Sequence, residues 1–135
     1  MIDDRDEPWT DATRARWQRI RDHAFEDAQA PLDFAAKLAR EQGWSRSEAR
    51  AAIEEYRRYC FLASVGGDAV VPSVGVDEVW HLHLTYTEDY WQRYCPETLG
   101  FPFHHRPGGL ARGDAAQYRR GYADTLAQYE RWFGA

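Results

Sequence analysis

The sequence predicts an all-α protein, a single compact domain of five or six helices in an orthogonal or bundle-like arrangement with one long Pro/Gly/His loop. Three observations support this prediction. Apolar residues recur at helical spacing in several segments of the 135-residue chain. Residues typical of helix caps frame those segments. No two segments share matching strand alternation, and a lone strand would leave its backbone groups unsatisfied. We expect residues 1–8 to form a flexible acidic lead-in and residues 9–135 to form the domain.

The first two helices are predicted from the capping residues at their ends. The first begins after Trp9, with Thr10 as its N-cap. The second has Pro31 at its first helical position, Asp33 just behind it, and Gly43 after its last turn. The inward face of the first helix consists of Thr13, Trp17, Ile20 and Ala24.

The third helix has the clearest sequence pattern. Ser45 and Glu48 have the spacing of a capping box, and the apolar stripe behind them stops at the glycine pair 66–67. One of the two cysteines, Cys60, lies on this stripe, where a plain core role is expected. Residues 66–75 are predicted to form a loop.

Residues 76–95 fit both a strand and a helix template, and we favour a helix because no partner strand exists. A break is expected near Tyr86, with Thr87 capping a second helix after it. Residues 96–109 contain three Pro and three Gly, which predicts a long irregular connection. A last helix is expected to start near Asp114.

Charge and composition argue against several classes of function. The net charge of -5 makes a nucleic-acid partner or an anionic membrane surface unlikely. No apolar run is long enough for a membrane span, and the acidic start is unlike a signal peptide, so we expect a cytoplasmic protein with reduced cysteines. A protein partner is compatible with this composition, and the oligomeric state is not indicated.

Residue types that bind metal ions gather in the second half of the chain. On a regular helix, residues two apart point about 200° away from each other. His81 and His83 could therefore share one ion only if the helix were broken between them. Alternatively, one of the adjacent histidines His104 and His105 could lie beside His81 and complete a three-ligand site. The candidate metal ligands are His81, His83, Cys95, His104 and His105.

Two carboxylates lie about one turn before His81 on the expected helix. Asp77 or Glu78 could co-ligate an ion, orient an imidazole, or act as a general base. The leading hypothesis is a polar site that binds a transition metal ion such as zinc. An open coordination position there would allow hydrolysis by an activated water.

The alternative hypothesis is a non-enzymatic protein–protein interaction module. In that case His83 is a hydrogen-bonded core residue and His81 pairs locally with Asp77. The partner would bind an aromatic surface near Tyr86, Trp91 or Phe103. Whether the chain is an enzyme stays open at this point. A position of His81 and His83 on opposite sides of one helix favours the module, and convergence of either with His105 and Cys95 favours the metal site.

A sequence resemblance covers residues 56 to 133. The pattern Asp-x-x-Trp-His-x-His, followed by a tyrosine and a cysteine, resembles the bacterial glycine-rich domain-containing protein-like family and the N-terminal domain of plant glycine-rich domain proteins. The resemblance implies no particular activity, because the family's domain has no established catalytic residues to carry over. The matching residues are Asp77, Trp80, His81, His83, Tyr90 and Cys95.

Overall fold

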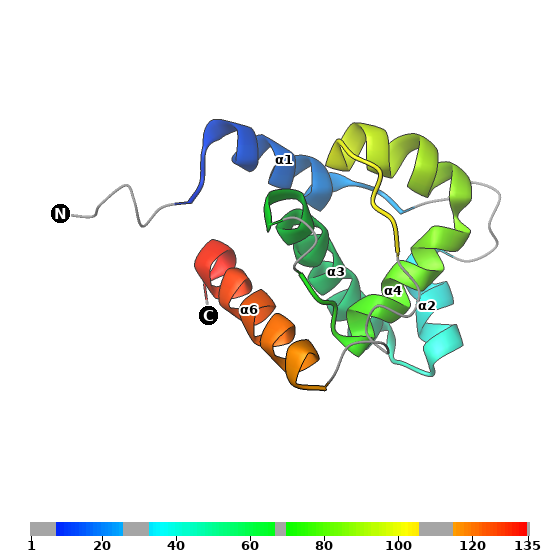
Figure 1. Ribbon diagram of the computed structural model, residues 1–135. Helices are drawn as coiled ribbons and strands as arrows, with labels where there is room; N and C mark the ends of the chain where they lie inside the picture. The colour runs from blue at the N-terminus through cyan, green and yellow to red at the C-terminus, as the bar shows by residue number, and fades with distance from the viewer. Residues whose placement is uncertain (1–7, 26–32, 67–69, 106–114, 135) are drawn as a thin grey trace.

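The computed structural model describes residues 8–25, 33–66, 70–105 and 115–134. These residues form six helices and no strand, which confirms the all-α prediction (Figure 1). Residues 1–7 of the expected lead-in lie outside the described residues. The helices are α1 (Asp11–Asp22), α2 (Phe34–Gln42), α3 (Arg46–Gly66), α4 (Val74–Thr85), the π-helix η3 (Glu88–Leu99) and α6 (Ala115–Phe133).

Three predicted caps are confirmed. The side chain of Thr10 accepts the backbone N–H of Thr13 at 3.1 Å at the start of α1. The Ser45 hydroxyl accepts the N–H of Glu48 at 3.0 Å, and the Glu48 carboxylate accepts the N–H of Ser45 at 2.8 Å. Gly43 follows α2 with φ 70°, a left-handed conformation that glycine adopts without a steric cost. Local side-chain chemistry therefore sets the ends of these helices.

Two predicted boundaries of the first two helices are wrong, and the loop predicted over residues 66–75 is shorter than expected, because α3 extends to Gly66 and α4 begins at Val74. The second helix begins at Phe34 with Asp33 as its N-cap, because the Asp33 carboxylate accepts a backbone N–H of the first turn. Pro31, which was expected at the first helical position, lies outside the described residues. The first helix ends before His23, which has an extended backbone, so Ala24 lies beyond the helical face to which it was assigned.

The predicted break near Tyr86 is confirmed, but the segment after it differs from the prediction. Thr87 has helical dihedral angles and makes no side-chain cap. The chain then continues as η3 through Pro96 to Leu99, so the irregular connection starts at Gly100 rather than at residue 96. A π-helix pairs residues five apart, and its wide turn accommodates the proline ring that would clash in an α-helix.

The core is aromatic and is built around α3. Figure 1 shows α3 between α6 and α4, and α3 also contacts α1, α2 and η3. Tyr56, Cys60 and Phe61 of α3 are fully buried, which confirms Cys60 as a core residue. Trp9 stacks on Phe61 with ring centroids 5.1 Å apart, so the chain before α1 packs onto the same core.

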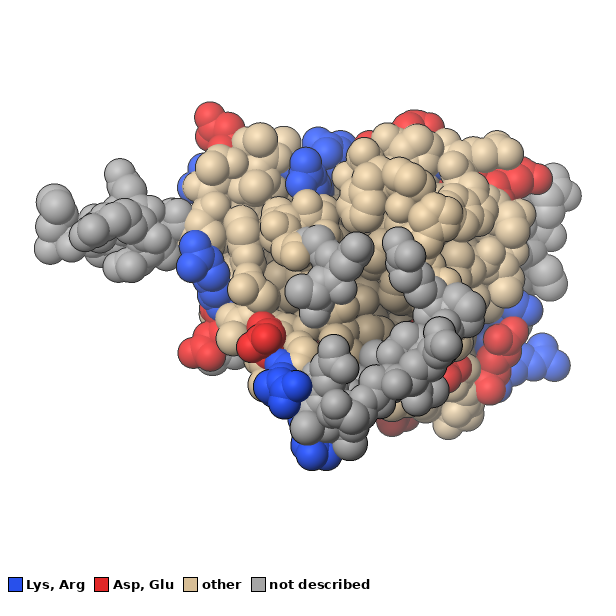
Figure 2. Space-filling view, viewed as in Figure 1, with Lys and Arg blue, Asp and Glu red and all other residues tan. Residues whose placement is uncertain are grey.

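Charged side chains lie interspersed on the face shown in Figure 2, with no continuous basic patch among the described residues there. Within the described ranges, no helix combines the length and the apolar character that a membrane span requires. The last helix begins at Ala115, and the predicted start at Asp114 lies outside the described residues.

Candidate metal centre

Histidine and carboxylate side chains gather in two places within the described residues. In each place, three side chains offer one ligand atom apiece, and these atoms lie within 4.8 Å of one another. Both groups contain two imidazoles and one carboxylate. We call Asp77, His81 and His105 the surface cluster, and His23, His83 and Asp89 the buried cluster.

The surface cluster forms where the segment after η3 crosses the start of α4. Asp77 lies in the first turn of α4 and His81 one turn later, a spacing that places both side chains on one helix face. Asp77 Oδ1 lies 2.6 Å from His105 Nε2, and Asp77 Oδ2 lies 3.4 Å from His81 Nε2. The two imidazole centroids are 4.6 Å apart. Three potential ligand atoms thus face one point.

The surface cluster is open to solvent. The side chain of His81 is 50% exposed, and those of Asp77 and His105 are 22% and 21% exposed. Of the two adjacent histidines His104 and His105, it is His105 that lies beside His81. An ion held here would have room for a water or a substrate beside the three protein ligands.

Three other candidate residues lie outside both clusters. The Glu78 carboxylate accepts a hydrogen bond from the Gln42 side chain on α2 at 3.0 Å. Cys95 is buried, and this burial raises the pKa of its thiol, which disfavours the thiolate that a nucleophile or metal ligand needs. The exposed ring of His104 lies against Trp91, with centroids 5.3 Å apart.

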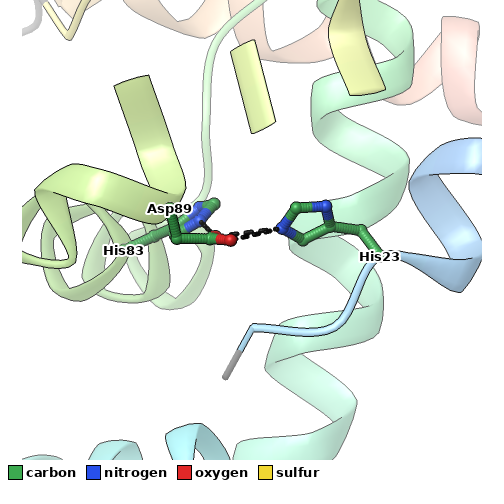
Figure 3. Close-up of side chains that lie close together, drawn as sticks. All are labelled: His23, His83 and Asp89. Carbon is green, nitrogen blue, oxygen red and sulfur yellow. Dashed lines mark hydrogen bonds and ion pairs between the residues drawn. The ribbon is translucent and has the colours of Figure 1, made fainter. Parts of the chain in front are cut away.

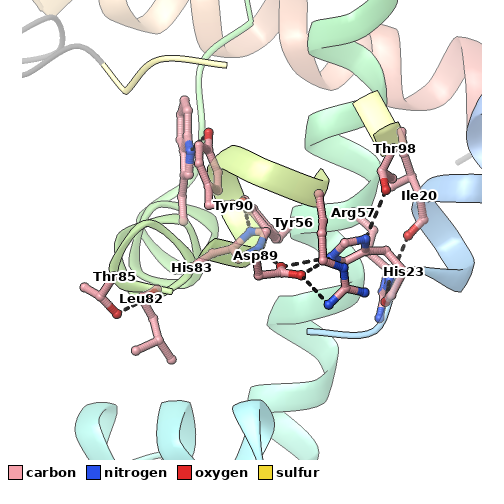
Figure 4. A network of polar contacts seen from close by, with 12 residues as sticks. Ile20, His23, Tyr56, Arg57, Leu82, His83, Thr85, Asp89, Tyr90 and Thr98 are labelled. Atoms are coloured by element: carbon pink, nitrogen blue, oxygen red, sulfur yellow. Dashed lines mark hydrogen bonds and ion pairs between the residues drawn. The ribbon is translucent and has the colours of Figure 1, made fainter. Parts of the chain in front are cut away.

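The buried cluster is a chain of hydrogen bonds through the core (Figure 3). Asp89 Oδ2 lies 2.6 Å from His83 Nε2 and 2.9 Å from His23 Nε2. The other ring nitrogen of each histidine also has a partner. His83 Nδ1 lies 2.7 Å from the Tyr56 hydroxyl, and His23 Nδ1 lies 3.0 Å from the Thr98 hydroxyl (Figure 4). The network therefore joins α1, α3, α4 and η3.

Burial and hydrogen bonding set the charge state of this network. Burial lowers the pKa of His83 to about 4, although its hydrogen bond to Asp89 acts in the opposite direction. Burial alone would raise the pKa of Asp89, but hydrogen bonds from His23 and His83 outweigh it and hold that pKa well below its usual range. At neutral pH His83 is neutral, donates from Nε2 to the Asp89 carboxylate and accepts at Nδ1 from Tyr56.

The Asp89 carboxylate has a third partner at the surface. The guanidinium of Arg93 lies 3.1 Å from Asp89 Oδ1, and the Arg93 side chain is 53% exposed. The carboxylate therefore has an imidazole donor from each side and a nearby cation. A buried charge with this many partners is satisfied without any ion.

The two histidines of the Trp-His-x-His segment thus have different surroundings. Helix α4 is continuous through both residues, and they point to opposite sides of it, as the interaction-module hypothesis expects. Yet His81 converges with His105, as the metal-site hypothesis expects, although Cys95 does not join them. Neither hypothesis is matched in full.

Sequence reasoning missed Asp89 and Tyr56 as partners of His83, and His23 as the second partner of Asp89. The sequence offers only a weak indication of them: Asp89 directly precedes Tyr90 and Trp91, and His23 lies two residues before Phe25. Such a pattern says that a polar group is near the core, but not which distant residue it meets. The contacts span 66 residues between His23 and Asp89 and 27 residues between Tyr56 and His83.

The aromatic residues suggested for a partner surface differ in exposure. Trp91 is 39% exposed, whereas Tyr86 and Phe103 are half-buried against the core. Single exposed aromatic residues are common on monomeric proteins. A partner surface at this place stays a prediction.

No protein-family model, curated protein or solved structure matches the chain. The resemblance to the glycine-rich domain-containing protein-like family is therefore carried by its motif residues alone and stays a prediction. The proposed function rests on the geometry of the two clusters.

Proposed function

We propose that the surface cluster binds a transition metal ion such as zinc through Asp77, His81 and His105. The observation that carries this proposal is the convergence of two imidazole Nε2 atoms on one carboxylate at a solvent-accessible place. Zinc takes nitrogen and carboxylate oxygen ligands at about 2.0–2.2 Å, and three protein ligands with one open position are typical of catalytic zinc sites.

The freedom of its side chains to move favours the surface cluster over the buried one as a zinc site. Tetrahedral ligands at about 2.0–2.2 Å from zinc lie roughly 3.3–3.6 Å from one another. The 2.6 Å separation between Asp77 and His105 must widen, and partly exposed side chains can move by that amount. The same widening around Asp89 would disturb a close-packed aromatic core and break hydrogen bonds that are already satisfied.

An open coordination position makes hydrolysis the chemistry we propose for this site. A bound zinc ion lowers the pKa of its water to about 7. Of the two carboxylates predicted to act as a general base, Asp77 serves as a ligand in this proposal. The other, Glu78, is held by Gln42 on α2. The residues around the cluster do not select a substrate class.

Zinc titration of untagged protein tests the proposal, with calorimetry as the measurement. The parent should bind one equivalent of zinc. Loss of residues that only support metal ligands costs about 10- to 100-fold in affinity, so Asp77→Asn and His105→Ala should each cost more than about 100-fold.

The neighbouring residue His104 provides a matched control, because it differs from His105 by one position and lies outside the cluster. His104→Ala should bind zinc like the parent. A parent without zinc binding, or equal zinc affinity in the His104 and His105 variants, contradicts the proposal.

A further inference from the structure

The segment that carries His105 depends on side chains of other elements for its position. Residues 101–105 belong to no helix or strand. The N–H of Phe101 donates to the Cys95 carbonyl at 3.0 Å, and the N–H of Phe103 donates to the Cys95 sulfur at 3.5 Å. The carbonyl of Phe103 accepts a hydrogen bond from the Tyr90 hydroxyl. These contacts fix the chain just before it reaches the surface cluster.

The Tyr90 hydroxyl links this segment to α4. Tyr90 is fully buried, and its hydroxyl accepts the indole N–H of Trp80 at 2.8 Å while donating to the Phe103 carbonyl. Trp80 in turn stacks on Phe103 with ring centroids 4.3 Å apart. The Trp80 ring also lies 4.4 Å from the ring of His105. One hydroxyl group therefore connects α4, η3 and the segment that carries the third ligand.

We propose that Tyr90 is a positioning residue for the surface cluster. Its hydroxyl fixes the Phe103 carbonyl, two residues before His105, and so sets His105 Nε2 against the carboxylate of Asp77. As far as it concerns metal binding, this inference rests on the proposed function. The ring of Tyr90 belongs to the core, whereas its hydroxyl has the positioning role.

Tyr56 offers a matched control for that hydroxyl. It is also fully buried, and its hydroxyl also makes a short hydrogen bond, to His83 Nδ1 in the buried cluster. No hydrogen bond joins it to residues 101–105 among the described contacts. Tyr56→Phe and Tyr90→Phe therefore each remove one buried hydroxyl from the same core, but only the second affects the segment before His105.

Cobalt binding to the full-length chain provides the first test, because Co²⁺ reports both affinity and ligand geometry through its visible absorption. Tyr90→Phe should weaken Co²⁺ binding about tenfold and change the absorption bands. Tyr56→Phe should keep the parent affinity within about twofold and the parent spectrum. Parent-like affinity and spectrum in Tyr90→Phe would overturn the inference.

Imidazole nitrogen spectra of the metal-free protein provide the second test and do not depend on metal binding. Tyr90→Phe should move the ring resonances of His105, and Tyr56→Phe should move those of His83 instead. If the parent binds no Co²⁺, the proposed function fails, and this measurement still decides the role of Tyr90. Unmoved His105 resonances overturn that role. If Tyr90→Phe does not fold, the parent itself provides the readout: the hydroxyl proton of Tyr90, held by the Phe103 carbonyl, should exchange slowly with water, and rapid exchange would overturn the inference.

Discussion

The two clusters contain the same chemical groups but differ in what surrounds them. Each has two imidazoles and one carboxylate, and each takes one histidine from the Trp-His-x-His segment of α4. In the buried cluster, the Asp89 carboxylate is held by two histidines and an arginine inside an aromatic core. In the surface cluster, the Asp77 carboxylate faces two partly exposed histidines.

This difference shows that ligand-type residues are not sufficient to identify a metal site. In the buried cluster every described ring nitrogen has a partner, so binding an ion would require breaking a satisfied network. In the surface cluster, water can replace the contacts that an ion displaces. We therefore assign stability to the buried cluster and ligand binding to the surface cluster, and the following predictions test that division.

The largest expected effect is on stability, from Asp89→Asn. The amide removes the charged acceptor of two buried imidazole N–H groups, and hydrogen bonds to a charged group contribute about 1.5–3 kcal/mol each, so the loss should be about 3 kcal/mol or more. Urea unfolding followed by circular dichroism measures this loss. Asp77→Asn is the matched control and should cost less than about 1 kcal/mol, because its partners are partly exposed. Equal losses of unfolding free energy in the two variants would contradict the assignment of stability to the buried cluster alone.

The second prediction concerns the pH dependence of stability. The pKa of His83 falls from 6.5 to about 4 on folding, so between these values the unfolded chain binds a proton that the native protein excludes. The free energy of unfolding should therefore fall as the pH drops from 6.5 to 4, by on the order of 3 kcal/mol. The lowered pKa of Asp89 acts in the same direction at still lower pH.

Comparison with His83→Gln isolates this contribution. The variant lacks the titrating group, so its unfolding free energy should depend less steeply on pH over that range. Urea unfolding at several pH values measures how steeply the unfolding free energy of each protein depends on pH. Parallel slopes for parent and variant would show that His83 is not held neutral by burial.

The third prediction is a gain in stability from zinc. An ion that binds only the native state stabilises it by about 2.7 kcal/mol at a free concentration one hundred times its Kd. The parent should show this gain in urea unfolding, and Asp77→Asn at the same zinc concentration should not. A gain that survives in Asp77→Asn but disappears in Asp89→Asn would place the ion in the buried cluster instead.

The smallest effect is expected for Arg93→Gln. The Arg93 side chain is 53% exposed, so solvent weakens its attraction to Asp89, and the loss should stay below about 1 kcal/mol. Thermal unfolding measured beside Asp89→Asn gives the comparison. A loss as large as that of Asp89→Asn would mean that the arginine, rather than the two histidines, stabilises the buried carboxylate.

Helix ends and the all-α class could be predicted from the sequence because their causes are local. The capping box at Ser45 and the left-handed Gly43 depend on residues within one turn. The π-helix across Pro96 could not be predicted in this way. A proline normally ends a helix, and the wide turn that tolerates it here depends on the packing of η3 against the rest of the core.

The surface cluster was partly predictable, and the buried cluster was not. The spacing of Asp77 and His81 on one helix face follows from helical periodicity, and a returning histidine was expected without a choice between His104 and His105. The meeting of His23 with Asp89 joins α1 to η3 across 66 residues. Such a contact depends on tertiary packing, for which a single sequence carries no periodic pattern.

The most direct test of the central claim is to compare His81→Gln with His83→Gln in untagged protein, measuring metal content by plasma mass spectrometry and unfolding in urea. These residues are two apart on one helix and belong to different clusters. We predict that His81→Gln stays as stable as the metal-free parent but loses its metal, and that His83→Gln loses stability but, where folded, keeps its metal. Metal loss in His83→Gln together with full metal content in His81→Gln would contradict the account.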